Sequence, residues 1–128
     1  MNTGFHHIGL KYSDLERSIK FYEALGLREY TRWGEKGDEI VMMAMTDGGI
    51  VELLPHGGDE FSEKGKWIHF AIKVDDVTAA FETALAAGAT PTVYPKVVPL
   101  DSKPTPMSIN VAFVKGPDGE EVEFFKIV

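Results

Sequence analysis

The chain repeats itself, and this repeat limits the folds that are open to it. A shift of 62 positions (7 to 69) places His7 on His69 and aligns further lysines, aspartates and glycines. A shift of 71 positions (52 to 123) places Glu52 on Glu123, within a shared Asp-Gly-x-x-Val-Glu motif. Each half therefore opens with a histidine and closes with a glutamate, both set in apolar segments. We expect two copies of one structural unit.

Length and composition are typical of one globular domain of 128 residues, with 44% hydrophobic and 26% charged residues. The net charge of −7 argues against a nucleic-acid or membrane partner, because both favour basic surfaces. The absence of cysteine excludes a disulfide framework, a thiolate nucleophile and a cysteine-based zinc site. The longest apolar run, residues 40–45, is far shorter than the ~20 residues of a membrane helix, and we expect no leader segment because a strand is already predicted from residue 5. We expect a soluble, cytoplasmic protein.

Hydrophobic periodicity predicts the same element order, β-α-β-β-β, in both halves of a single domain over residues 1–128. The first module, about residues 5–54, is expected to contain strands at 5–12, 27–33, 39–46 and 50–54. The second, about residues 67–127, is expected to contain strands at 67–74, 89–94, 109–115 and 121–127. Residues 55–66 are expected to be a linker, since they are polar and contain glycine.

Local signals predict where helices and loops begin and end. The segment Ser13-Asp-Leu-Glu16 fits a capping box that starts the first helix, and Gly26 is expected to end it. Asp75 or Asp76 is expected to cap the second helix, which ends at Gly88. Four prolines between residues 95 and 107 predict a loop there rather than a strand. Long loops of this kind often serve as lids or binding segments.

The repeated polar side chains share one face of the predicted sheets. Strand alternation places them opposite the branched and aromatic residues that must pack against the helices. The four are His7, Glu52, His69 and Glu123. A buried carboxylate is costly unless it is paired or coordinated, and imidazole nitrogen with carboxylate oxygen suits a divalent cation. A lone strand histidine is more often structural, but repetition in both halves favours a metal site.

The remaining candidates have weaker support. His6 has no counterpart in the second half, and we interpret it as structural. His56 also lacks a counterpart, and we interpret it as a pocket residue. Lys11 has a repeat partner and lies on the metal face near its edge. It either contacts an anionic substrate or is a solvated strand end.

These motifs resemble those of the vicinal oxygen chelate superfamily, which includes glyoxalase I, methylmalonyl-CoA epimerase, extradiol dioxygenases, fosfomycin-resistance proteins and bleomycin-binding proteins. The motifs are His7-Ile-Gly-Leu, Ser13-Asp-Leu-Glu-Arg-Ser-Ile-Lys-Phe-Tyr22, Val51-Glu-Leu, Ile68-His-Phe-Ala-Ile and Gly116-Pro-Asp-Gly-x-x-Val-Glu123. The resemblance covers residues 5–127. It implies an α+β fold in which two βαβββ modules form a cupped mixed β-sheet around a metal. It also implies a homodimer whose sites are shared across the interface.

A complete His, Glu, His, Glu set is similar to that of glyoxalase I. The resemblance implies one divalent metal ion per site, held by His7, Glu52, His69 and Glu123. The short chain is similar to the bacterial enzymes that use Ni²⁺ or Co²⁺, and Zn²⁺ stays open. The implied activity is that of a lyase or isomerase on a small α-oxo compound or its thiol hemithioacetal. Proton transfer would pass through a metal-stabilised enediolate, with Glu123 as the base and Glu52 as the opposing carboxylate.

Two alternatives stay open. One is a carbon-acid epimerase similar to methylmalonyl-CoA epimerase, where the second ligand is often glutamine. The other is a small-molecule binding or resistance protein without turnover. Positions that in glyoxalase I commonly carry an arginine and an asparagine for glutathione are Lys11 and His56 here. A different thiol, or a substrate without a thiol, is therefore open.

Overall fold

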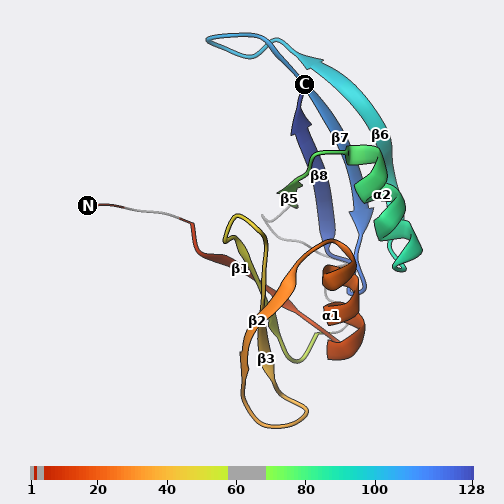
Figure 1. The fold of residues 1–128 in the computed structure, drawn as a ribbon. Helices are drawn as coiled ribbons and strands as arrows, with labels where there is room; N and C mark the ends of the chain where they lie inside the picture. Colours follow the sequence, from red (N-terminus) through yellow and green to blue (C-terminus); the bar gives the residue numbers. More distant parts are fainter. Residues whose placement is uncertain (1, 3–4, 58–68) are drawn as a thin grey trace.

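The computed structural model describes residue 2 and residues 5–57 and 69–128, which form two β-α-β-β-β units (Figure 1). The first unit contains β1 (His7–Lys11), α1 (Leu15–Ala24), β2 (Arg28–Trp33), β3 (Ile40–Ala44) and β4 (Ile50–Leu54). The second contains β5 (Phe70–Lys73), α2 (Val77–Ala86), β6 (Thr90–Leu100), β7 (Met107–Lys115) and β8 (Glu121–Ile127). Most of the predicted linker, residues 58–66, and the predicted strand start at residues 67 and 68 lie outside the described residues.

Each unit forms one four-stranded mixed sheet, with strand order β1-β4-β3-β2 in the first and β5-β8-β7-β6 in the second. The first and last strands of each unit pair in parallel, and the other pairs are antiparallel. Two parallel strands must be joined by a crossover connection. In each unit this connection starts with the helix, α1 after β1 and α2 after β5. The α+β prediction with two βαβββ modules is confirmed, and the mixed sheet is divided into two.

A single hydrophobic core joins the two units. Each helix lies along one side of its own sheet in Figure 1. The core cluster includes Ile19 and Tyr22 from α1, Phe81 and Ala84 from α2, and apolar strand residues of both sheets. The polar faces of β1, β4, β5 and β8 therefore look away from this core. The described part of the chain contains no helix long and apolar enough to cross a membrane.

Both helices start at an aspartate and end at a glycine. Asp14 caps α1 and accepts a hydrogen bond from Arg17 N at 3.1 Å, and Asp76 caps α2 in the same way. The predicted capping box at Ser13 is therefore wrong by one residue. Ser13 instead uses its hydroxyl in a contact with the second unit. Gly26 and Gly88 follow the helices with φ of 92° and 102°, a conformation that favours glycine.

The predicted loop over residues 95–107 is wrong, because β6 continues to Leu100 and pairs with β7. Only residues 101–106 connect the two strands. β6 is an edge strand, so one of its sides needs no hydrogen-bond partner and proline is tolerated there. Pro95 lies in a shift of the pairing register between Val93 and Lys96, where the regular ladder is interrupted. The hairpin projects beyond the rest of its sheet at the top of Figure 1.

Candidate functional site

The first candidate pair is formed by His7 on β1 and Glu52 on β4. In the β1–β4 register Gly9 is the partner of Glu52, so His7, two residues earlier, lies on the same face. His7 Nε2 is 3.7 Å from Glu52 Oε1, and their side chains are 38% and 14% exposed. Gly9 lies beside the carboxylate, and a Cβ added there would be 4.0 Å from Glu52 Oε1 and only 3.0 Å from Leu54 Cδ1.

The second pair repeats this arrangement with His69, just before β5, and Glu123 on β8. His69 Nε2 is 2.9 Å from Glu123 Oε2, and their side chains are 33% and 11% exposed. Ala71 is the register partner of Glu123, as Gly9 is of Glu52. Phe113 on β7 is the register partner of Glu123 on β8. Its ring contacts the His69 ring edge-on, with the two ring centroids 5.1 Å apart.

The geometry of each pair fits two ligands of one divalent ion. Nitrogen and oxygen ligands that bind such an ion at about 2.0–2.2 Å lie roughly 3 Å from each other. Within the described residues, neither Glu52 nor Glu123 forms an ion pair with a lysine or arginine. Each pair offers one imidazole nitrogen and one carboxylate oxygen on a half-buried surface. These are donors that Zn²⁺, Ni²⁺ and Co²⁺ all accept.

The two pairs do not meet within one chain. Across residues 5–57 and 69–128, no three histidine, aspartate or glutamate side chains are grouped closely enough to hold a metal ion. Each pair is therefore half of the predicted ligand set. The complete set of His7, Glu52, His69 and Glu123 stays a prediction that needs a second source of ligands.

His6 contacts the first pair, a role that the sequence did not indicate beyond its position next to His7. His6 Nδ1 lies 2.9 Å from His7 Nδ1, and the two rings are nearly perpendicular. One of these two ring nitrogens donates a hydrogen bond to the other. A partner that fixes one imidazole nitrogen orients the other one for metal binding.

The two predicted substrate-binding residues lie apart from the pairs. Lys11 is exposed at the end of β1. His56 is also exposed, has a left-handed φ of 71°, and places Nε2 3.4 Å from Asp38 Oδ1. Neither residue has a contact with the four candidate ligands in the described part of the chain. Their role in substrate binding stays a prediction.

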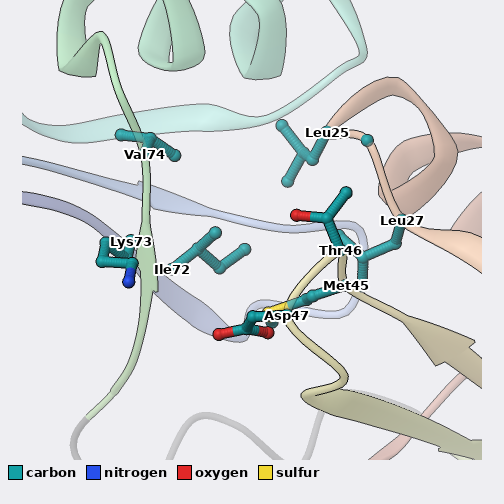
Figure 2. A pocket seen from close by; sticks show the side chains of 9 residues that line it. Leu25, Leu27, Met45, Thr46, Asp47, Ile72, Lys73 and Val74 are labelled. Carbon is teal, nitrogen blue, oxygen red and sulfur yellow. The ribbon is translucent and has the colours of Figure 1, made fainter.

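The pocket shown in Figure 2 lies between the two units and includes none of the candidate ligands. It is lined by Leu25, Gly26, Leu27, Met45, Thr46, Asp47, Ile72, Lys73 and Val74. A second, mostly apolar hollow includes Ile50 and Ala71, which are register neighbours of His7 and Glu123. This second hollow adjoins the histidine–glutamate surface.

Two buried acidic side chains of the β7–β8 turn were missed by the sequence reasoning. Glu120 is 1% exposed, and its Oε2 accepts a hydrogen bond from the Tyr22 hydroxyl at 2.9 Å. Burial raises the pKa of Glu120. Burial, followed by the charge of Glu120, raises the pKa of Tyr22 well above its usual range. Asp118 of the same turn accepts hydrogen bonds from Ser13 and Ser18.

Comparisons with known proteins agree with this architecture. The sequence profile described as Glyoxalase/Bleomycin resistance protein/Dioxygenase superfamily matches residues 4–124. The chain is 33% identical to a lactoylglutathione lyase of Haemophilus influenzae, over 94% of this chain and 90% of that protein. It is 32% identical to a protein of Vibrio cholerae named "Probable lactoylglutathione lyase", over 94% and 88% of the two chains.

Solved structures share the fold at lower sequence identity. A glyoxylase/bleomycin resistance protein/dioxygenase domain from Frankia superposes with a TM-score of 0.76 at 19% identity, covering all of both chains. The trypanothione-dependent glyoxalase I of Leishmania major superposes with a TM-score of 0.68 at 25% identity, covering 98% of this chain and 87% of that one.

Proposed function

Because the chain belongs to the Glyoxalase/Bleomycin resistance protein/Dioxygenase superfamily, we propose that it is a metal-dependent, glyoxalase I-like lyase. Its substrate would be a small α-oxo compound or the hemithioacetal that such a compound forms with a thiol. The observation that carries the proposal is the pair of matching histidine–glutamate half-sites, at 3.7 and 2.9 Å. The names of the relatives at 32% and 33% identity support the same activity.

The proposal requires a homodimer. One chain offers two ligands at each of two separate places, whereas a catalytic site of this kind needs about three or four protein ligands. A symmetric pair of chains can bring the first half-site of one copy to the second half-site of the other, and symmetry then makes two such sites. The absence of cysteine fits a reducing cytoplasm as the compartment.

His7, Glu52, His69 and Glu123 would hold one divalent ion per site, with Ni²⁺ or Co²⁺ favoured over Zn²⁺. When bound, the ion would polarise the adjacent oxygens of the substrate. The Glu123 carboxylate would take the proton from the carbon that carries sulfur and return it to the neighbouring carbon. Glu52 would face the same two carbons from the other side. The carbon-bound proton returns to the neighbouring carbon and the hydroxyl proton passes to the other oxygen, so the isomerisation balances without an oxidant. Lys11 and His56 are proposed to contact the non-reacting part of the substrate.

The test is metal binding followed by turnover. Calorimetry with Ni²⁺, Co²⁺ and Zn²⁺ should show binding, and the metal-loaded protein should isomerise hemithioacetals of methylglyoxal. Glu123→Gln should lower kcat by roughly 10²–10⁴-fold, the usual contribution of a general base. The matched control is Glu121→Gln, two residues earlier on the same face of β8, which should retain most of the activity.

Three other outcomes would decide against the lyase. A protein that binds none of these metals is not a metal-dependent enzyme of this kind. A metal-loaded protein that fails with several thiols but exchanges the α-proton of an acyl-CoA is an epimerase. Tight binding of a small molecule without any turnover indicates a binding protein.

A further inference from the structure

The two units contact each other at two places, which correspond to each other through the sequence repeat. The hydrogen bonding at these two contacts differs. We name the first the locked junction, in which residues 13–22 contact the β7–β8 turn at residues 116–120. The repeat relates it to residues 75–84 and 45–49, and we name these residues, together with the end of β5 at residues 72–74, the open junction. The pocket in Figure 2 lies at the open junction.

Hydrogen bonds that range from exposed at Ser13 to buried at Tyr22 hold the locked junction together. Asp118 Oδ1 accepts from Ser13 N at 3.0 Å and from its hydroxyl at 2.5 Å, and Oδ2 accepts from the Ser18 hydroxyl at 3.3 Å. Glu120 Oε1 accepts from Asp118 N at 2.8 Å, while Oε2 accepts from the Tyr22 hydroxyl. Ser18, Tyr22 and Glu120 are at most 1% exposed. Buried carboxylates whose acceptors are satisfied in this way rigidify the contact.

The backbone of the turn is matched to this network. A Cβ added at Gly116 would lie 2.7 Å from the carboxyl carbon of Glu120, so any larger residue would displace that side chain. Arg17 closes the outer edge, where its guanidinium donates to Pro117 O at 3.2 Å and to Ser13 Oγ at 2.9 Å.

The open junction lacks every side-chain donor of this network. The counterparts of Ser13, Ser18, Tyr22, Asp118 and Glu120 are Asp75, Ala80, Ala84, Asp47 and Gly49. Asp47 keeps the carboxylate, but Oδ1 accepts from Gly49 N within its own turn at 3.0 Å. Apolar side chains of Leu25, Met45 and Ile72 line the pocket that stays between the units. Among the described residues, side-chain hydrogen bonds therefore link the two units at the locked junction alone, and elsewhere the units meet through the hydrophobic core.

The locked junction connects the strands that carry the two half-sites. Ser13 follows the end of β1, which carries His7, and Glu120 comes directly before β8, which carries Glu123. We propose that Asp118 and Glu120 are positioning residues that fix the first half-site relative to the second in each chain. This rests on the proposed function, in which each chain supplies one half to each of two sites. A change in the angle between the units would misplace both halves, and a shift of about 1 Å can cost about 10²-fold in activity.

The test measures the angle between the units without using activity. The chain has no cysteine, so Glu23→Cys on α1 and Glu82→Cys on α2 give two clean positions for spin labels. Both positions are exposed. Labelled protein diluted with unlabelled protein gives the distance distribution within one chain. Asp118→Asn should broaden that distribution, and Asp47→Asn, the same change at the open junction, should leave it unchanged.

Ser13→Ala is a milder second variant, which removes one hydroxyl and should broaden the distribution less. Ser13→Thr restores the hydroxyl and should return the distribution to that of the wild type. Nickel binding forms the second readout, with affinity expected to fall about tenfold or more in Asp118→Asn and to be kept in Asp47→Asn. Equal distributions in Asp118→Asn and the wild type, or equal effects of the two aspartate changes, would overturn the proposal. If the wild type binds no nickel, the proposed function fails, and the label distances still decide the positioning role.

Discussion

The sequence predicts the position of some functional side chains in this chain and gives no sign of the contacts of others. Alternation along the strands was enough to place His7, Glu52, His69 and Glu123 on one face, because period-two spacing decides which side chains oppose the core. It was not enough to find Glu120, since a glutamate in a turn usually points to solvent. Glu120 is buried because Tyr22, nearly a hundred positions away, donates to it. No local pattern contains that contact.

The buried carboxylate gives the first prediction at this scale. Burial raises the pKa of Glu120 above its usual value of 4.5, against the lowering effect of its hydrogen bonds. The folded state therefore holds this proton more tightly than the unfolded state. The contribution of Glu120 to stability is full below pH 4.5 and is lost as the pH rises through its raised folded pKa.

Glu120→Gln keeps the shape of the side chain and cannot ionise. The free energy of unfolding of the wild type should therefore fall relative to that of Glu120→Gln as pH rises above about 4.5, and the difference should then become constant. Urea unfolding of both proteins across this pH range checks the prediction. A difference that is independent of pH would show that Glu120 does not ionise within the range.

The ends of helices and strands lie where the local sequence predicts them when no other part of the chain is involved. They differ from the prediction where a contact with another part of the chain competes. The glycines after both helices were correctly predicted, because a left-handed residue is needed there. The cap of α1 moved from Ser13 to Asp14, because Asp118 of the other unit binds the Ser13 hydroxyl. The prolines of β6 indicated a loop, yet an edge position makes proline tolerable in a strand. Sequence alone does not say which strand is the edge.

The caps provide the prediction at the scale of elements. Asp14→Ala and Asp76→Ala each remove one hydrogen bond to the first turn of a helix, at 3.1 and 3.0 Å in the two helices. Each change should lower the free energy of unfolding by about 1 kcal/mol. Asp75→Ala, one residue before the cap of α2, should change it by less than about 0.5 kcal/mol. Denaturant titration of the three variants makes the comparison. If Asp75→Ala lowers the free energy of unfolding as much as Asp76→Ala does, Asp76 is not the residue that caps α2.

At the scale of the whole molecule, the repeat correctly indicated two βαβββ units, but it did not indicate how far apart their histidine–glutamate pairs would lie. Strand periodicity orders side chains within a sheet and contains no information about the angle between two sheets. Within the described residues the pairs stay separate, and one hydrophobic core holds the units in that arrangement. Under the proposed function, assembly of a four-ligand site depends on a second chain, which makes complementation between variants a direct test.

His7→Ala damages only the first half-site of a chain, and Glu123→Gln damages only the second. Each variant alone should lack hemithioacetal isomerisation, since every site in its homodimer is incomplete. A dimer of one variant chain with the other has one intact site and one doubly damaged site, because the intact halves come from different chains. Co-refolding equal amounts should therefore restore about a quarter of the wild-type activity, since about half of the dimers are mixed. His7→Ala mixed with Glu52→Ala, which damages the same half-site, should restore none. If the first mixture also stays inactive while mixed dimers are seen by native mass spectrometry, the sites are not shared between chains.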